Sequence, residues 1–303
     1  MLSSPMTGGY IQRGLTLTVT VGVMLSLFVM RSSADENAPS VAHVEEILEP
    51  ASSRATNSVG DKNAAFAWSA HAEIDANYLW RGLYCGGLSI QAEADVSYYG
   101  FFANMWWNIG ASDWNYGKRD AKGVPQPLFN PEVDVAIGYR YKGLQILFIH
   151  MYYFDRYADG RMSHYFDWGN HAQGGGGVTT EWRVSYRISD QVPLRLLWCT
   201  RTFGRDGYMS EGVLKRAYST YIEARYDQVL PCNFMLSAVI GVTPWRSLYT
   251  QYNKGFAVTN LSVELDKSWQ MTEYCDLNLG GVLMFNPSSM TPLWNVRVGV
   301  SWH

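Results

Sequence analysis

The chain of 303 residues carries 24 Lys and Arg against 27 Asp and Glu, a formal net charge of -3, and 15% of its residues are aromatic. This charge provides no electrostatic footprint for nucleic acid, so no nucleic-acid partner is expected. Tyr and Trp have amphipathic rings, and their abundance favours a membrane interface instead.

The N-terminal segment 1–34 is typical of a signal peptide. Arg13 precedes the apolar run GLTLTVTVGVMLSLFVM and small residues follow it, so we expect cleavage after Ala34. The alternative is an uncleaved anchor, because the run approaches the ~20 residues that span a bilayer. No apolar run of that length recurs after residue 34. An exported chain of this kind is expected to be either a secreted protein or a β-barrel.

Residues 35–65 are polar and poor in aromatic residues, which predicts a periplasmic N-terminal linker that is largely disordered. From Phe66 onward the chain changes to segments of alternating polarity, the pattern of half-buried strands. Strands are predicted at 66–81, 88–99, 101–110, 131–142, 144–155, 179–189, 193–203, 216–227, 232–243, 255–266, 270–285 and 292–303.

The connections between these twelve predicted strands alternate in length. Short ones fall at 98–100, 141–143, 189–193, 227–232 and 266–270, and longer polar ones include 111–130, 156–178, 204–215 and 244–254. This alternation predicts an all-β fold over 66–303, a transmembrane up-and-down antiparallel β-barrel of about 12 strands. Short turns are expected on the periplasmic side, together with both termini, and the longer loops on the extracellular side.

The two faces of the segment 179–203 differ in polarity with a period of two. Trp182, Val184 and Tyr186 share one face and are expected to contact lipid, whereas Arg183 and Arg187 are expected to face the lumen. A soluble sandwich is the alternative, but it requires a second layer over each apolar face, and no helical segment of useful length supplies one. The segment 144–154 is apolar on both faces, which leaves its register open.

The predicted inner faces place acidic side chains on one arc and basic side chains on another. Two interpretations stay open: a transverse field across an open pore, which favours polar or charged solutes, or interstrand ion pairs that fill and stiffen a narrow lumen. The candidate pore-lining residues are Glu73, Asp75, Glu93, Asp95, Glu132, Asp134, Arg183, Arg187, Arg195, Arg201, Glu223, Arg225, Glu264 and Arg297.

No catalytic residue, metal site or cofactor is predicted. Same-face carboxylates such as Glu93 and Asp95 arise wherever lumen positions are polar. The long loop 156–178 contains four residues that could ligate a cation, but their spacing matches no motif: Asp159, His164, Asp167 and His171. Cysteines without CxxC spacing leave open either one or two disulfides or unpaired thiols, at Cys85, Cys199, Cys232 and Cys275.

The segment IDANYLWRGLYCGGLSIQAEADVSYYGFFANMWW resembles the opening of the TorF-type porins, a family of exported outer-membrane barrels. The resemblance covers residues 72–107 and implies a location and a barrel without naming a substrate. It rests on Tyr78, Leu79, Trp80, Arg81, Gly82, Ile90, Gln91 and Gly100.

Arg81 lies beside Gly82 at the predicted outer end of the first strand. It could bind a lipopolysaccharide phosphate, contribute to the pore mouth, or pair with Asp75 or Glu93.

These features predict an outer-membrane channel of a Gram-negative envelope for passive passage of small polar solutes or ions. Twelve strands enclose more space than a filled eight-stranded barrel and less than a sixteen-stranded porin. The expected partners are outer-membrane lipid and lipopolysaccharide, the barrel-assembly machinery during insertion, and small solutes. The alternatives are a lipid-modifying barrel enzyme, with Ser163 and His164 as the nearest candidates, and a closed structural or adhesive barrel.

Overall fold

The computed structural model describes residues 66–111, 129–154, 162–172, 177–189, 191–253 and 255–303. The predicted signal peptide at 1–34, the linker at 35–65, most of the loop 111–130 and Asp159 lie outside these residues. In the part of the chain that is described, no helix combines the length and the hydropathy needed to cross a bilayer.

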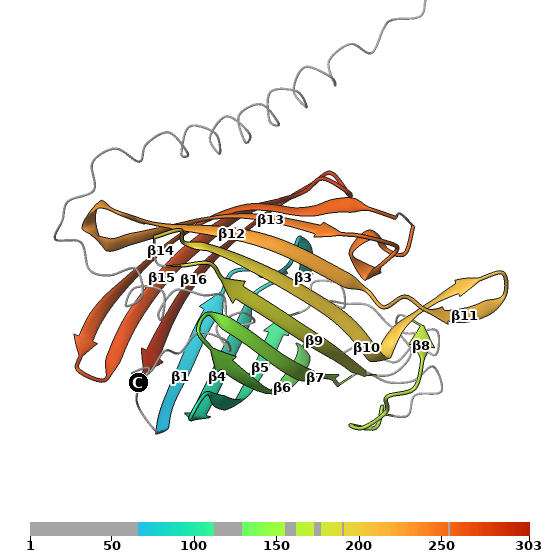
Figure 1. Ribbon diagram of the computed structural model, residues 1–303, viewed down its shortest axis with the longest axis horizontal. Helices are drawn as coiled ribbons and strands as arrows, with labels where there is room; N and C mark the ends of the chain where they lie inside the picture. The colour runs from blue at the N-terminus through green and yellow to red at the C-terminus, as the bar shows by residue number, and fades with distance from the viewer. Residues whose placement is uncertain (1–65, 112–128, 155–161, 173–176, 190, 254) are drawn as a thin grey trace, which may run out of the picture. The chain divides into compact units, whose positions relative to one another are not determined.

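Twelve of the described strands form one closed antiparallel ring, which confirms the predicted barrel (Figure 1). Strand β16 pairs with β1 from Ala70 opposite Trp302 to Asp75 opposite Arg297, and this pairing closes the ring. In ring order the strands are β1 (Phe66–Asp75), β4 (Ser89–Tyr98), β5 (Phe101–Ala111), β6 (Phe129–Tyr141), β7 (Leu144–Tyr153), β9 (Val178–Arg187), β10 (Leu194–Ser210), β12 (Thr220–Leu230), β13 (Phe234–Thr243), β14 (Ala257–Thr272), β15 (Cys275–Asn286) and β16 (Thr291–Trp302).

Shorter elements lie in the connections between ring strands. They are β2 (Tyr78–Trp80), β3 (Leu83–Gly86), β8 (His171–Ala172), β11 (Val213–Arg216) and the 3₁₀ turns η2 (Pro231–Asn233) and η3 (Leu248–Thr250). We call the end with the connections β4–β5, β6–β7 and β14–β15 the short-turn end, and the opposite end the long-loop end.

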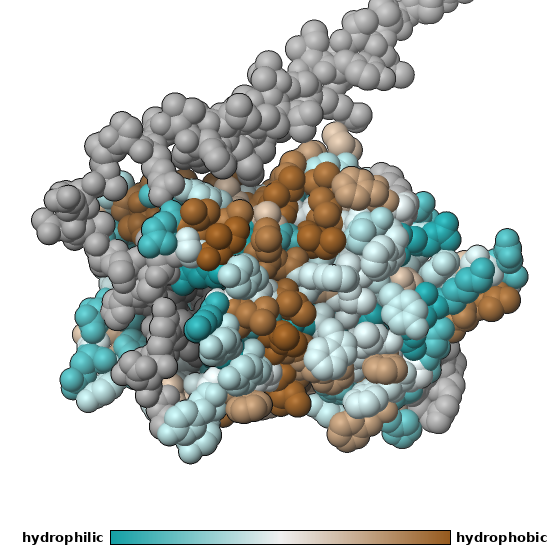
Figure 2. Space-filling view, viewed as in Figure 1, coloured by the Kyte–Doolittle hydropathy of each residue, from teal (hydrophilic) through white to brown (hydrophobic). Residues whose placement is uncertain are grey.

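The alternation of polarity along the strands separates two faces, as predicted. On β9, Trp182 and Tyr186 are 48% and 46% exposed, whereas Arg183 between them is 5% exposed. On β16, Val296 and Val298 are likewise exposed and Arg297 is buried. Exposed apolar side chains on the outside of a closed sheet are what contact with lipid requires. Figure 2 shows hydrophobic side chains along one side of this outer surface.

The register of β7, which the sequence left open, is fixed by an apolar cluster on the inner face. Leu147, Ile149 and Met151 pack there with Phe102 of β5 and Ala136 of β6. This part of the inner face is therefore apolar on several adjacent strands, and the lumen is not polar at every position.

The predicted first strand 66–81 is wrong in its second half. Strand β1 ends at Asp75, and Tyr78–Trp80 instead pairs with β3 in a separate hairpin. The reversal occurs at Arg81 and Gly82, which have φ values of 50° and 86°. Gly82 tolerates this left-handed backbone because it has no Cβ.

The predicted short turn at 266–270 is also wrong, because β14 continues to Thr272. Lys267 lies opposite Leu279 of β15, and the turn follows at Glu273 and Tyr274. A Lys near the end of a barrel strand extends its ammonium group beyond the apolar surface, and Lys267 contacts the carbonyl oxygen of Cys232. Its charge therefore does not mark a turn.

All four cysteines are free, which answers the question of disulfides that the sequence left open. Cys199 is buried, Cys85 and Cys275 are half-buried, and Cys232 is exposed.

Candidate functional site

The β2–β3 hairpin, residues 78–86, folds into the interior of the barrel at its long-loop end. A Cβ atom on Gly82 would lie 1.8 Å from the carbonyl oxygen of Thr259 on β14. The Asn286 side chain of β15 donates a hydrogen bond of 2.9 Å to the Gly82 carbonyl. On the other side, the Tyr78 hydroxyl donates to Glu132 Oε2 of β6 at 3.2 Å. The hairpin thus contacts inner faces on both sides of the ring.

Arg81 holds the tip of this hairpin against the wall, in what we call the hairpin clamp. Its guanidinium donates to both carboxylate oxygens of Glu181 on β9, at 2.7 and 2.8 Å, and to the Tyr249 hydroxyl at 2.9 Å. Arg183 also approaches Glu181, at 3.3 Å. A bidentate pair of this kind fixes both position and orientation. Arg81 therefore pairs with Glu181, and the predicted pairing with Asp75 or Glu93 is wrong.

A second inward segment, η3 in the connection 244–256, meets the hairpin inside the ring. Tyr249 is 3% exposed and packs against Trp80 of the hairpin, with ring centroids 5.5 Å apart. Its position is set by Ser219, whose hydroxyl accepts from the Leu248 amide at 2.9 Å and donates to Asp206 at 2.5 Å. Two inward segments therefore narrow the same region of the lumen.

Aromatic and guanidinium groups alternate in this narrowed region. Arg81 lies over the Trp80 and Tyr221 rings at 4.6 and 5.2 Å, and Arg201 lies over the Trp80 ring at 5.2 Å. Stacking of planar cations on aromatic faces favours a compact arrangement.

A second set of charges links several strands of the ring, and we call it the wall network. Arg225 pairs with Asp227 at 2.9 Å and with Glu264 at 3.0 Å, and Arg297 pairs with Asp266 at 2.6 Å. Arg195 approaches Asp227 at 3.8 Å, and Arg297 approaches Glu264 at 3.8 Å. Side chains therefore join five strands of the ring, in addition to its backbone pairing. The five are β10, β12, β13, β14 and β16, and β13 takes part through Ser237.

The acidic arc is also largely paired. Glu73 lies 3.1 Å from His71, Asp75 accepts from Asn295 at 2.5 Å, Glu93 accepts from Asn104 at 2.6 Å, and Asp95 pairs with Arg140 at 3.2 Å. Charges on the basic arc are likewise matched by carboxylates such as Glu181 and Asp227. The separation of acid from base that the sequence suggests is therefore only partial.

The remaining candidates lie on inner-face positions as well. Glu223 accepts a hydrogen bond of 2.5 Å from the Tyr221 hydroxyl, and Arg187 is half-buried near the short-turn end. Asp134 and Arg201 lie closer to the narrowed region. Whether any of these side chains lines a conduction path stays a prediction.

Three carboxylates in these networks were not among the candidates, namely Glu181, Asp227 and Asp266. Each lies two residues from a candidate on the same strand, so the period of two could have identified them. Tyr249 could not have been found in this way, because it comes from a connection that the sequence gives no reason to place inside the barrel.

The residues of the enzymatic alternative do not assemble into a catalytic arrangement. Ser163 is 4% exposed, and its hydroxyl has no hydrogen-bond partner among the described residues, whereas His164 is exposed. His171 pairs with Asp167 at 2.9 Å. Among the described residues, no group of three or more His, Cys, Asp or Glu side chains is arranged to hold a metal ion.

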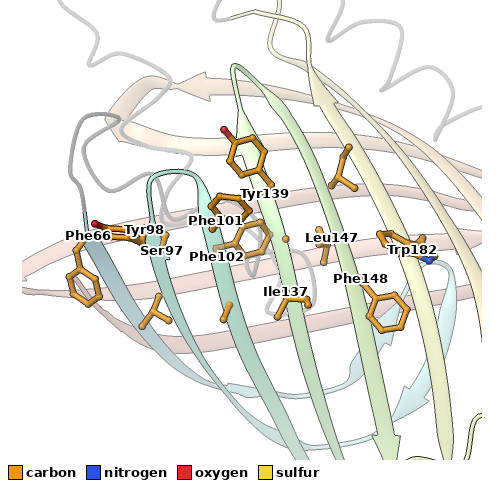
Figure 3. A pocket seen from close by; sticks show the side chains of 14 residues that line it. Phe66, Ser97, Tyr98, Phe101, Phe102, Ile137, Tyr139, Leu147, Phe148 and Trp182 are labelled. Atoms are coloured by element: carbon orange, nitrogen blue, oxygen red, sulfur yellow. The ribbon is translucent and has the colours of Figure 1, made fainter.

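An apolar groove lies on the outer surface towards the short-turn end (Figure 3). Outward side chains such as Tyr139, Ile146 and Trp182 line it, and it offers almost no polar surface. Such a lining is suited to lipid chains and offers no chemistry.

Comparison with known proteins gives similarity of architecture only. No protein-family model matches the chain, and no curated protein matches it. Among solved structures, it is similar to a KdgM porin, with a TM-score of 0.41 and 9% identity over 78% of this chain and 98% of that one.

Two further solved structures illustrate the range of proteins with this architecture. The COG4313 outer membrane channel from Pseudomonas putida F1 has a TM-score of 0.40 and 12% identity, over 80% of this chain and 98% of that one. Outer membrane phospholipase A from Escherichia coli has a TM-score of 0.35 and 11% identity, over 78% of this chain and 92% of that one.

Proposed function

We propose that this chain is an outer-membrane channel for passive passage of small polar solutes or ions. The observation that carries the proposal is the closed barrel with an exposed apolar outer face and a charged inner face. A structural barrel has no need of an inner face with so many charged groups, since apolar packing would fill it as well. The resemblance of residues 72–107 to the TorF-type porins agrees with this proposal.

The hairpin and η3 set the width of the channel in this proposal. Both segments lie inside the ring at the long-loop end, and Trp80 and Tyr249 bring bulky rings into the same region. Passage is then limited to solutes smaller than those admitted by an unobstructed ring of twelve strands.

The proposal is tested by recording single-channel currents from the purified, refolded chain in planar bilayers. Discrete ionic steps are expected. A protein that migrates as a folded barrel in an unheated gel sample but gives no steps would contradict the channel and favour the closed structural barrel.

The orientation belongs to the same proposal, with the long-loop end outside the cell. Val213 in β11 is 58% exposed at that end, and Lys142 lies in the short turn between β6 and β7. A single cysteine at 213, in a chain whose four native cysteines are replaced by Ser, should react with an impermeant maleimide on intact cells. A cysteine at 142 should react only after lysis, and the reverse pattern would invert the orientation.

A further inference from the structure

Two opposite charges in the barrel interior differ from all the pairs described above. Arg201 on β10 is 4% exposed, yet within the described residues its guanidinium makes no ion pair or hydrogen bond, and it lies over the Trp80 ring at 5.2 Å. Asp134 on β6 makes neither interaction in the described part of the chain, and its Oδ1 is shielded from solvent without a partner. Charged groups in such positions are normally paired.

Strand register places these two residues close to the same level of the barrel. Arg201 lies opposite Glu181, Glu181 opposite Ile149, and Ile149 opposite Ala136, which is two residues from Asp134. Three strand spacings of about 4.8 Å separate the two backbones along the curved wall. Both side chains extend inward from a concave surface, so the charged groups are closer than the backbones.

The same two signs continue along both strands. Arg205 follows Arg201 on β10 and lies over the Tyr153 ring at 4.4 Å. Glu132 precedes Asp134 on β6 and accepts from Tyr78 at 3.2 Å. Between the two groups, the charge of Glu181 is already balanced by Arg81 and Arg183. The interior therefore presents basic side chains from β10 and acidic side chains from β6 to the same region.

We propose that Arg201 and Asp134 form a binding site for a small zwitterion, a step that rests on the proposed channel function. The carboxylate of the solute is held at Arg201 and its ammonium group at Asp134. Two opposite charges on separate strands are complementary to an amino acid whose own charged groups are separated by several bonds, or to a dipeptide. A lone anion or cation gains at one end and is repelled at the other, so the zwitterion is preferred over both.

The experiment measures swelling of proteoliposomes in 4-aminobutanoate and in erythritol, an uncharged solute of similar size that crosses bilayers slowly. The native chain should admit the zwitterion about fivefold faster relative to erythritol, the factor that corresponds to about 1 kcal/mol. Arg201→Gln and Asp134→Asn should each abolish this preference while retaining erythritol entry. Lys215→Gln and Glu211→Gln make the same charge changes on exposed residues in and next to β11 and should retain it.

Reversal potentials in a KCl gradient provide a second measurement. Substitution of a residue with only a structural role would leave the reversal potential unchanged. Arg201→Gln should shift selectivity towards the cation and Asp134→Asn towards the anion. Absence of entry by either solute, with no channel steps, would refute the channel itself. Entry of erythritol without a preference for the zwitterion, or shifts of the same sign in both variants, would refute the zwitterion site while leaving the channel intact.

Discussion

The wall network and the hairpin clamp use the same residue types for different purposes. In the wall network, Arg225 and Arg297 join carboxylates on β14 across one intervening ring strand each, so the ion pairs tie together strands that are already held in the ring. In the hairpin clamp, Arg81 reaches Glu181 from a segment that belongs to no ring strand. Loss of the wall network should therefore destabilise the barrel itself, whereas loss of the hairpin clamp should release the hairpin inside the barrel.

The largest effect is expected from removal of residues 294–303, which tests the wall alone. Strand β16 pairs with β1 and β15 and carries Arg297 of the wall network. Without it the ring has two open edges, whose unpaired backbone groups cannot be satisfied in lipid. Membrane insertion should be lost, as measured by the fraction of protein that resists extraction from outer membranes with urea.

Removal of the hairpin is the matched control for this truncation. Replacing residues 77–87 by a short Gly and Ser linker leaves every ring pairing in place, and insertion should be normal. Equal loss of insertion in the two variants would mean that the hairpin is part of the barrel scaffold. The distinction between the ring strands and the inserted hairpin would then be wrong.

A smaller effect is expected from Arg297→Leu, which removes one member of the wall network. Asp266 and Glu264 would lose a partner, and both are buried. Breaking a buried pair in this way costs about 3 kcal/mol, at the lower end of the usual range because Glu264 keeps Arg225 as a partner. Unfolding by guanidinium in detergent should move to lower denaturant, whereas exposed Lys215→Leu should leave it unchanged.

Arg81→Ala should reverse this pattern, with a small loss of stability and a large change in conductance. Glu181 keeps Arg183 as a partner, so the unfolding free energy should fall by about 2 kcal/mol, less than for Arg297→Leu. The hairpin tip loses its attachment, and single-channel conductance should rise by roughly twofold as the narrowed region opens. A stable variant with native conductance would show that the hairpin does not restrict the passage.

Much of the barrel was predictable because its wall obeys one local rule. Period-two alternation placed Trp182 outside and Arg183 inside, and it located all the ring strands. Period-two alternation failed to predict the structure where the polarity of a residue is set by a local contact and not by the face on which it lies. Lys267 looked like a turn residue but extends from a strand end, and Leu147, Ile149 and Met151 are apolar on the inner face because they pack together there.

The interior was less predictable, because its contacts join residues far apart in the chain. The pair of Arg81 with Glu181 spans 100 residues, and the contact with Tyr249 spans 168. Alternation shows that a side chain points inward but not which inward group it meets. The motif residues Tyr78, Trp80, Arg81 and Gly82 were identified as a unit, yet their role in an inserted hairpin depends on its fold.

The smallest expected effect comes from Tyr78→Phe, which tests the opposite side of the hairpin from the clamp. The substitution removes one hydrogen bond, of 3.2 Å to Glu132, while keeping the ring that packs 5.8 Å from Trp106. A single neutral donor of this kind contributes about 1 kcal/mol, so the hairpin should stay in place. Conductance should change little, but the open-channel current should become noisier because one anchor of the hairpin is weaker. Tyr186→Phe, on the exposed outer face, is the matched control and should leave the noise unchanged. If Tyr78→Phe instead raises conductance as much as Arg81→Ala, the hairpin is held from both sides equally, and Arg81 has no special part in attaching it.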